Sequence, residues 1–293
     1  YKTYFKMKQL KIFIELTRLD KPIGFMLLFW PCSWGLAYAF YFDQDLKKNL
    51  FFLLLFFLGS ILMRSAGCIV NDIIDKDFDK KVERTKNRPL ASDKISIKKS
   101  LLITLILCSI AFLILIQFNK ITIMLGLASM TLAFSYPYMK RITYWPQLFL
   151  GLTFNWGVIM AWTSFNNLIS FEILLLYISA IFWTLGYDTI YGAQDIAEDE
   201  IIGIKSTSIK FKENIKLFVS FCYLISSMFL FISIYSIMNV NYSIILFISY
   251  ILSLGYQIKI FDKKKPTTCL KAFKINNLSG LLLYSTIMSL SLK

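Results

Sequence analysis

Residues 50–79 read LFFLLLFFLGSILMRSAGCIVNDIIDKDFD, an apolar run that ends in a cluster of acidic residues. About 20 mainly apolar residues are enough to cross a lipid bilayer as a helix. Arg64 is the one charged residue before the acidic cluster in this stretch. The stretch therefore predicts a membrane-spanning helix that brings carboxylates to one surface of the membrane.

The rest of the chain is similarly apolar. Of its 293 residues, 57% are hydrophobic and 17% are aromatic, which excludes an ordinary soluble enzyme of this size. No Pro/Gly/Ser-rich linker separates a second domain. We predict an all-α fold, a polytopic membrane bundle of about nine transmembrane helices in a single domain over residues 1–293. The predicted spans cover residues 22–42, 50–71, 99–117, 121–138, 146–164, 171–191, 215–236, 242–258 and 270–290.

The basic residues predict how these spans are oriented. Most of the 32 Lys and Arg residues lie in the N-terminal segment 1–21 or after the second, fourth, sixth and eighth spans. Basic loops stay on the cytoplasmic side, so this segment and both acidic clusters are expected there. We predict a bacterial inner (cytoplasmic) membrane, with the mitochondrial inner membrane as the alternative. The net charge of +14 follows from this topology and from contact with the lipid bilayer, and does not indicate nucleic acid.

A second acidic cluster follows the sixth predicted span, where residues 187–199 read YDTIYGAQDIAED. Side chains four residues apart share one face of a helix. One stripe is therefore predicted to contain Asn71, Asp75 and Asp79, and the other to contain Asp188, Tyr191, Asp195 and Asp199. Carboxylates concentrated beside hydrocarbon are costly unless a cation compensates them.

Ordinary ion pairs at a solvated helix end are the alternative interpretation. Asp72 with Lys76 and Asp77 with Lys81 are spaced for such pairs, and for Asp72 and Asp77 the two interpretations remain equally open. The main stripe of the first cluster instead places like charges at that spacing. In the second cluster the nearest following base along the chain is Lys205. A divalent cation explains these remaining carboxylates better.

The available ligands select the kind of cation. The chain has no histidine, and its five cysteines have no paired spacing. Carboxylate and amide oxygens suit a hard cation, and Mg²⁺ is commonly shared between one or two carboxylates and substrate phosphates. We therefore predict a phosphate-bound Mg²⁺ site. A protein cage for Ca²⁺ is less consistent with the sequence, because no loop carries alternating ligands.

Basic residues near the clusters are candidates for holding the phosphate. Arg64 lies inside a predicted span, where an ionisable residue suggests function, although a salt bridge to a neighbouring span would also explain it. After the first cluster come Arg84, Lys86 and Arg88, for which phosphate binding and ordinary loop charge are equally open. The other candidates are Lys140 and Arg141 at the end of the fourth span, and Lys205.

At these residues the chain resembles the UbiA family of membrane prenyltransferases. The pattern Asn-Asp-x-x-Asp-x-x-x-Asp at 71–79 and the pattern Asp-x-x-x-Asp at 195–199 match the two diphosphate-Mg²⁺ motifs of that family. Further runs resemble the members that prenylate 4-hydroxybenzoate in ubiquinone biosynthesis. These runs are LTRLDKPIG at 16–24, WP at 30–31, RSAGC at 64–68, NRPL at 87–90, YPYMKR at 136–141 and GIKST at 203–207.

The resemblance implies transfer of a polyprenyl group from its diphosphate to the ring carbon ortho to the hydroxyl of 4-hydroxybenzoate. It implies Mg²⁺ ligands at Asn71, Asp75, Asp79, Asp195 and Asp199. It implies that Asp72 is a further metal-binding residue, either as a ligand or as an adjacent group, and that Asp188 is an adjacent group able to accept the ring proton. It implies that Arg64, Lys140 and Lys205 neutralise the diphosphate, that Arg141 holds diphosphate or benzoate, and that Arg18 and Lys21 are further candidates. Tyr138, Tyr187 and Tyr191 are candidates to shield a carbocation, although simple packing is the favoured explanation for each.

Two alternatives remain open. Another UbiA-type prenyltransferase would use a quinone precursor, haem or a chlorophyll-type acceptor. A cation transporter would use the carboxylates as a relay, but the third, fourth, seventh and ninth predicted spans have no acidic residue in their cores. No obligatory protein partner is inferred. We also expect no cleaved signal peptide, because the first long apolar run is long enough to span the membrane.

Overall fold

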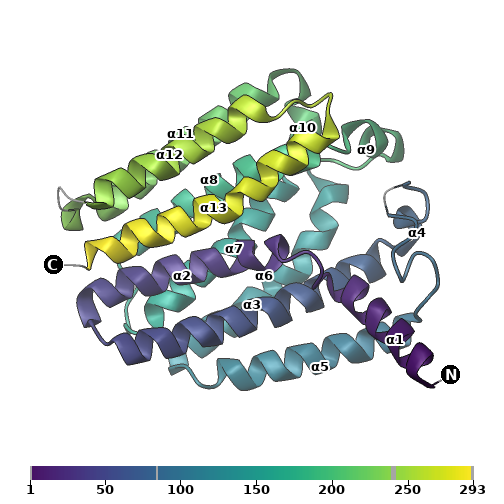
Figure 1. Ribbon diagram of the computed structural model, residues 1–293, viewed down its shortest axis with the longest axis horizontal. Helices are drawn as coiled ribbons and strands as arrows, with labels where there is room; N and C mark the ends of the chain where they lie inside the picture. The colour runs from purple at the N-terminus through teal and green to yellow at the C-terminus, as the bar shows by residue number, and fades with distance from the viewer. Residues whose placement is uncertain (1, 84, 239–241, 292–293) are drawn as a thin grey trace. The chain divides into compact units, whose positions relative to one another are not determined.

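The computed structural model describes residues 2–83, 85–238 and 242–291, and every regular element in these ranges is a helix (Figure 1). The first helices are α1 (Lys2–Thr17), α2 (Ile23–Asp43), α3 (Leu46–Ile74), α4 (Lys76–Asp79) and α5 (Ile97–Leu115). They are followed by α6 (Lys120–Ile142), α7 (Pro146–Thr163), α8 (Phe171–Gly192), α9 (Ile196–Ile202) and α10 (Thr207–Lys210). The last are α11 (Ile215–Ile234), α12 (Tyr242–Ile260) and α13 (Pro266–Leu290), with short 3₁₀ turns at Lys212–Asn214 and Tyr235–Ile237.

Each predicted span corresponds to one long helix. Among the described residues, seven helices are long and apolar enough to cross a membrane, and they begin at Ile23, Leu46, Ile97, Lys120, Phe171, Lys212 and Tyr242. Helices α7 and α13 were also predicted as spans but are outside this set. They carry more polar residues, such as Gln147 and Asn155 in α7 and Asn276 in α13. The all-α membrane fold is confirmed, whereas the count of nine remains a prediction.

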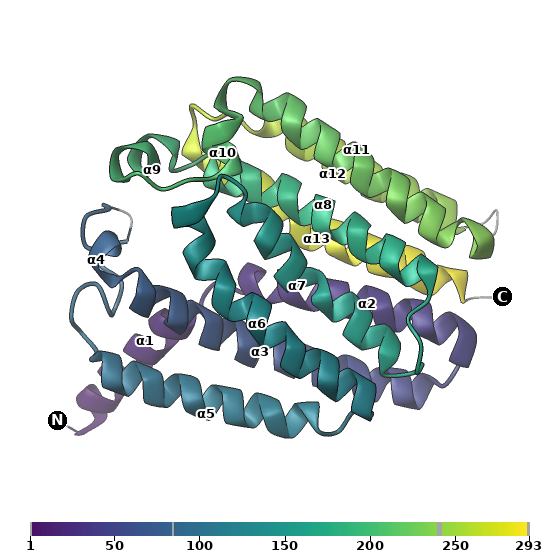
Figure 2. The same ribbon diagram turned by 180° about the vertical axis from the view of Figure 1, so that it is seen from behind.

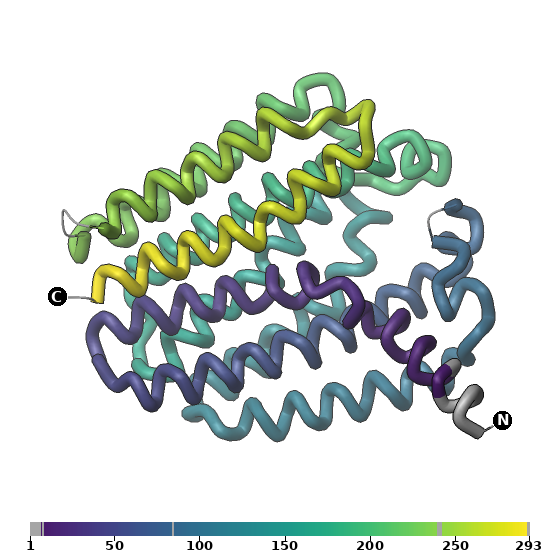
Figure 3. The backbone as a smooth tube through the Cα atoms, in the orientation of Figure 1, coloured from purple at the N-terminus to yellow at the C-terminus, as the bar shows by residue number. Residues whose placement is uncertain are grey.

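Contacts between residues divide the chain into two compact units. The first unit comprises residues 1–26 and 57–117 and contains the first acidic cluster. Its core combines Leu16 of α1, Ile69 of α3, Leu107 of α5 and Leu90 of the loop after α4. Burial of Leu90 fixes this loop to the helices. The backbone trace follows the chain from α3 through α4 and this loop into α5 (Figure 3). The prediction that residues 1–293 form one domain stays a prediction.

The second unit comprises residues 27–56 and 118–293, and α8 is its central helix. Helix α8 packs against α7, α11 and α13, and α6 lies on the other side of α7 (Figure 2). Gly186 allows the ring of Tyr223 on α11 to pack directly on the α8 backbone. Tyr223 donates a hydrogen bond to Gln257 Oε1 at 2.6 Å, and Asn276 donates to the same oxygen at 2.9 Å. Buried polar pairing of this kind holds membrane helices together, and it supports the helix that leads into the second acidic cluster.

Candidate functional site

The first acidic cluster lies where α3 changes into α4. Helix α3 ends at Ile74, and Asp75 has φ −95° and ψ 3° before α4 begins. The backbone N–H of Asp75 still donates to Asn71 O at 2.9 Å, and that of Asp79 donates to Asp75 O at 2.8 Å. The spacing of one helical turn therefore continues through the junction, as the sequence predicted. Asn71, Asp75 and Asp79 follow one another along this path.

The carboxylates of this cluster are withdrawn from solvent. Asp72 is 1% exposed, Asp75 is 6% exposed and Asp79 is 8% exposed. A buried charge is stable in a protein only when it is paired or hydrogen-bonded. The cluster therefore requires cationic partners close by.

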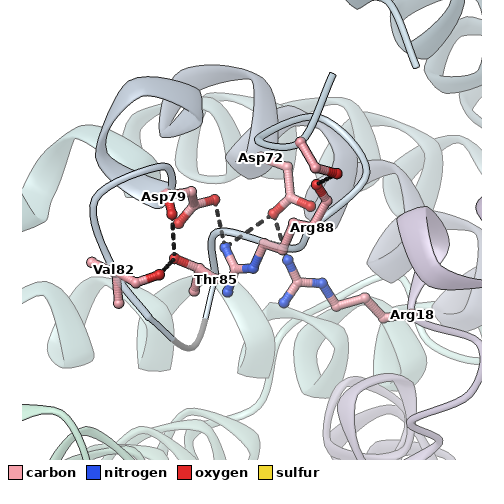
Figure 4. A network of polar contacts seen from close by, with 7 residues as sticks. Arg18, Asp72, Asp79, Val82, Thr85 and Arg88 are labelled. Atoms are coloured by element: carbon pink, nitrogen blue, oxygen red, sulfur yellow. Dashed lines mark hydrogen bonds and ion pairs between the residues drawn. The ribbon is translucent and has the colours of Figure 1, made fainter. Parts of the chain in front are cut away.

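Two arginines from distant parts of the sequence supply positive charge (Figure 4). Arg18 lies in the turn after α1, and its Nη2 pairs with Asp72 Oδ1. Arg88 lies in the loop after α4, and its Nη1 is 2.7 Å from Asp79 Oδ2 and 3.3 Å from Asp72 Oδ1. The two guanidinium groups and the carboxylates of Asp72 and Asp79 form a group without net charge.

This arrangement differs from the ion pairs suggested by spacing. Lys76 does not pair with Asp72, and its Nζ is 2.6 Å from Asp93 Oδ1 instead. Lys80 Nζ is 3.1 Å from the other carboxylate oxygen of Asp93. Asp72 lies in α3, which ends at Ile74, whereas Lys76 begins the separate helix α4. Hydrogen bonds from the two lysines hold the pKa of Asp93 below its usual range.

Arg88 is the residue that the sequence left undecided. It was grouped with Arg84 and Lys86 as a loop charge, and no helical spacing connects it to Asp72 or Asp79. Lys86 pairs with Glu83 at 2.6 Å, and Arg84 lies outside the described residues. The available signal was the neighbouring Leu90, an apolar residue in a polar loop, because its burial requires the loop to fold back.

Local hydrogen bonds give this loop its shape. Thr85 Oγ1 donates to the backbone oxygen of Asp79 at 3.0 Å, and Ser92 Oγ donates to that of Arg88 at 2.7 Å. The backbone N–H of Arg88 donates to Thr85 O at 2.9 Å. The chain therefore turns directly after Asp79, and the loop brings Arg88 back to the Asp79 carboxylate.

The other predicted basic residues of the first unit are Arg64 and Lys21. The guanidinium group of Arg64 lies beside Gly24, where a Cβ atom would be 3.1 Å from Nε and 3.6 Å from Nη2. Gly24 therefore leaves the space that this guanidinium occupies. Lys21 has an exposed side chain, and its carbonyl accepts from the Gly24 backbone N–H at 3.1 Å.

The second acidic cluster has the same local form as the first. Helix α8 ends at Gly192, and Asp195 has φ −114° and ψ 8° before α9 begins. The Asp199 backbone N–H donates to Asp195 O at 2.8 Å, the same distance as between Asp79 and Asp75. In each unit a long helix is thus followed by an aspartate with non-helical dihedral angles, Asp75 or Asp195, and then by a short helix. A second aspartate, Asp79 or Asp199, lies one turn later in that short helix. Asp188, Asp195 and Asp199 are partly buried.

The segment after α9 joins the second cluster to α6. Gly203 adopts a left-handed conformation, φ 74°, and the Ile204 N–H donates to Asp199 O at 3.0 Å. The next N–H, that of Lys205, donates to Lys140 O at 2.9 Å. The predicted basic residues Lys140, Arg141 and Lys205 are thereby brought to the same end of the second unit as Asp199. Lys205 Nζ donates to Ile142 O at 3.3 Å.

Helix α10 fixes this segment to the body of the second unit. Ser208 Oγ donates to the Thr189 backbone oxygen at 2.8 Å, and the hydroxyls of Thr189 and Thr207 are 2.7 Å apart. The Thr207 backbone N–H donates to Gln147 Oε1 on α7 at 3.0 Å. These contacts restrict how far the acidic turn can move relative to α7 and α8.

The predicted aromatic residues lie in different environments. Tyr187 is 1% exposed, with its ring centroid 4.7 Å from that of Trp183 and 5.8 Å from that of Phe273. Tyr191 lies 4.5 Å from the same Phe273 ring. Tyr138, by contrast, is 47% exposed. Tyr187 is packed in the core, whereas Tyr191 is partly accessible beside the acidic residues.

The donor chemistry of both clusters fits a hard divalent cation. All the predicted ligands are carboxylate or amide oxygens, which Mg²⁺ prefers. Within the described ranges, no group of three or more Cys, Asp or Glu residues is arranged to hold a metal ion by itself. Mg²⁺ commonly binds one or two carboxylates, with phosphate oxygens and water completing its shell. Arg88 contacts Asp79 Oδ2. In the second cluster Glu200 pairs with Lys212 at 2.7 Å.

Comparison with known proteins agrees with these features. The sequence profile of the UbiA prenyltransferase family matches residues 28–278. The chain is 41% identical over 285 residues to the mitochondrial 4-hydroxybenzoate polyprenyltransferase of Caenorhabditis elegans, covering 97% of this chain and 79% of the relative. It is 46% identical over 211 residues to the protein of that name from Drosophila melanogaster, covering 72% of this chain and 53% of the relative. The chain therefore spans only about half the length of some relatives.

Solved structures share the fold. A UbiA homologue from Aeropyrum pernix superposes with a TM-score of 0.75 at 19% identity, covering 90% of this chain and 97% of the other. A homologue from Archaeoglobus fulgidus, solved with GPP and Mg²⁺ bound, gives a TM-score of 0.71 at 15% identity, covering 96% of this chain and all of the other. With the helical fold, the two acidic turns and the family match together, the chain belongs to the UbiA prenyltransferase family.

Proposed function

We propose that this protein transfers a polyprenyl group from a polyprenyl diphosphate to the ring carbon ortho to the hydroxyl of 4-hydroxybenzoate, a step of ubiquinone biosynthesis. The observation that supports the reaction type most directly is the repeated acidic turn, formed once by Asp75 and Asp79 and once by Asp195 and Asp199. The similarity to relatives named 4-hydroxybenzoate polyprenyltransferase supports the acceptor.

We infer that both acidic turns bind Mg²⁺ together with the diphosphate. Asp75 and Asp79 would supply ligands in the first unit, with Asn71 one turn earlier, and Asp195 and Asp199 would supply them in the second. Phosphate oxygens would complete the shell of the ion. When bound, Mg²⁺ would neutralise the negative charge that develops on the leaving diphosphate.

The basic residues would complete this neutralisation. Arg64 in the first unit and Lys140 and Lys205 in the second are placed near their respective acidic turns in sequence or in space. Arg141 would hold either the diphosphate or the benzoate carboxylate, and Lys21 remains a predicted member of the site. Cations placed around a leaving diphosphate stabilise it more than they stabilise the bound substrate, because its charge increases as the bond breaks.

The chemical step needs little further assistance. The allylic C–O bond breaks and the diphosphate leaves with the electron pair. The ring carbon ortho to the phenol hydroxyl then forms a C–C bond with the allylic carbon and loses its proton. Asp188 is our candidate acceptor for that proton, alongside a diphosphate oxygen or water. Tyr191 would shield the allylic cation with its π face, whereas Tyr187 and Tyr138 fit that role less well because one is packed in the core and the other is largely exposed.

We place the site on the membrane face that carries the basic loops. This is the cytoplasmic face in a bacterial inner membrane or the matrix face in a mitochondrial inner membrane. The relatives reported above carry mitochondrial names. The polyprenyl tail would lie between helices in contact with lipid.

The test is an acceptor panel with purified protein in lipid nanodiscs, a polyprenyl diphosphate and Mg²⁺. We expect prenylation of 4-hydroxybenzoate and none of 1,4-dihydroxy-2-naphthoate or haem. Activity should disappear with EDTA and return with added Mg²⁺. Prenylation of another acceptor would contradict the proposed substrate. Uncoupled cation flux through proteoliposomes without any prenyl transfer would favour the transporter alternative.

A further inference from the structure

We propose that Asp72 is a positioning residue, and not a Mg²⁺ ligand as the sequence suggested. Its carboxylate would hold Arg18 and Arg88 so that their remaining N–H groups bind one phosphate of the diphosphate. This inference rests on the proposed function, because it assigns the side chains that receive the substrate in the first unit.

The contacts of Asp72 are those of an anchor. Its Oδ1 accepts from both Arg18 and Arg88, and the side chain is 1% exposed. Its Oδ2 is buried and has no hydrogen-bond partner among the described residues. A metal ion at Oδ1 would lie beside two guanidinium groups and be repelled by both. Asp79, by contrast, pairs with Arg88 through its Oδ2.

The backbone of Arg18 adopts an unfavourable conformation that places its side chain beside Asp72. Arg18 has φ 56°, in the left-handed region that disfavours residues with a Cβ atom. It follows the last residue of α1, and the Leu19 N–H donates to Ile14 O at 3.2 Å, closing the helix in a Schellman motif. The same motif closes α9, where the equivalent residue is Gly203. An arginine at the glycine position therefore carries strain that a glycine would not.

Arg88 depends on the same carboxylate. A single nitrogen, Nη1, contacts both Asp72 and Asp79, so loss of the Asp72 charge would change how Arg88 meets Asp79. The loop itself would keep its shape, because Thr85 and Leu90 fix it independently. Asp72 can therefore affect the position of the guanidinium without unfolding the loop.

The two arginines retain unused donors. A guanidinium group has five N–H donors, and the contacts described here use Nη2 of Arg18 and Nη1 of Arg88. The structure gives the other N–H groups no protein partner among the described residues. The side chains are 24% and 22% exposed, so a ligand can reach them. Two neighbouring guanidinium groups with unused donors suit a phosphate group, which accepts paired N–H bonds.

The test separates anion binding from metal binding. Inorganic pyrophosphate binding would be measured by calorimetry with Mg²⁺ present, and Mn²⁺ binding by electron paramagnetic resonance without pyrophosphate. We expect Asp72→Asn to weaken pyrophosphate binding on the order of 30-fold, as for loss of one member of a buried charge pair. Mn²⁺ binding should change far less than in Asp79→Asn. Asp77→Asn, the same change at an exposed position of the cluster, should leave both affinities as in the wild type.

Two further comparisons keep the proposal falsifiable. Arg18→Gly removes the guanidinium and its pairing with Asp72 but relieves the left-handed strain, so it should be more stable than Arg18→Ala and should bind pyrophosphate weakly. Arg18→Gln and Arg88→Gln should each cost much less in the Asp72→Asn background than in the wild type, because coupled residues give non-additive effects.

Several results would overturn the proposal. These are a loss of Mn²⁺ affinity in Asp72→Asn as large as in Asp79→Asn, unchanged pyrophosphate binding in Asp72→Asn or Arg18→Gly, or additive double variants. A wild-type protein that binds both ions but prenylates no acceptor would instead contradict the proposed function. The binding results would still decide the role of Asp72.

Discussion

Gly24 leaves room for the Arg64 guanidinium, because a larger side chain at position 24 would extend into the space that this group occupies. We predict that Gly24→Val displaces this guanidinium and raises KM for the polyprenyl diphosphate about tenfold, as for one weakened charge-assisted hydrogen bond of roughly 1.5–3 kcal/mol. KM for 4-hydroxybenzoate should change little. Gly59→Val is the matched control, because a β-carbon at Gly59 meets no atom within 4 Å. Equal effects of the two variants would show that Gly24 has no special relation to Arg64.

Asp195 in the second acidic turn is a proposed metal ligand, and its replacement tests that role. Asp195→Asn removes a proposed metal ligand and should lower kcat by about 100-fold or more, the usual cost of losing one electrostatic contact to a transition state. Glu198→Gln lies in the same turn but is exposed, and it should retain nearly full activity. Steady-state rates at saturating Mg²⁺ would test this. Similar losses in both variants would point to a general charge effect.

At the scale of elements, the short helix α4 is fastened to the following loop by Asp93. Lys76 and Lys80 lower the pKa of Asp93 in the folded protein, so the pairing stabilises the fold above the unfolded pKa of about 3.9. The stabilisation is lost as the pH falls through the lower, folded pKa. Asp93→Asn should therefore unfold at a lower temperature than the wild type at pH 7, and the difference should vanish in strong acid. The effect will be small, because Asp93 is exposed.

Thermal unfolding in detergent across this pH range is the measurement, with Asp77→Asn as the control. Asp77 is an exposed acid of the same segment, so its replacement should give no pH-dependent difference. If the difference in unfolding temperature between Asp93→Asn and the wild type grew larger in acid, the prediction would be wrong, because a lowered pKa requires that difference to shrink.

The end of α9 gives a prediction about both stability and activity. Gly203 has φ 74°, and an alanine there would cost roughly 1–2 kcal/mol in the left-handed conformation. The following Lys205 is placed by the same turn, so Gly203→Ala should reduce prenyl transfer as well as the unfolding temperature. Gly255→Ala is a suitable control, since Gly255 lies within α12 and its β-carbon would meet no neighbouring atom. Unchanged activity in Gly203→Ala would mean that the turn does not position Lys205 for catalysis.

The elements also show what the sequence could and could not predict. Apolar length alone predicted the nine longest helices among the described residues, because the requirement to span hydrocarbon leaves few alternatives. It did not predict α1, whose sequence is basic. The four-residue spacing predicted that Asp75 and Asp79 lie one helical turn apart. The structure agrees, because the backbone N–H of Asp79 donates to the oxygen of Asp75. The pairing of Arg88 with Asp79 could not be predicted, because it depends on a loop that folds back. Likewise, nothing local in the sequence relates Arg18 to Asp72, which is 54 residues away.

At the scale of the whole molecule, each of the two units ends a long helix in the same acidic turn and brings basic residues to it. In the first unit, arginines pair with the buried carboxylates. In the second unit, the partly buried carboxylates lie at the same end as Lys140 and Lys205. We propose that these turns support C-prenylation of 4-hydroxybenzoate.

The most direct test is the product mass obtained with 4-hydroxybenzoate that carries deuterium at both ring positions ortho to the hydroxyl. Purified protein would be incubated with this acceptor, a polyprenyl diphosphate and Mg²⁺, and the product analysed by mass spectrometry. We expect one prenyl group per ring and the loss of a single deuterium, because the new C–C bond replaces one ring C–D bond. A product that keeps both deuterium atoms, or no prenylated product at all, would contradict the proposal.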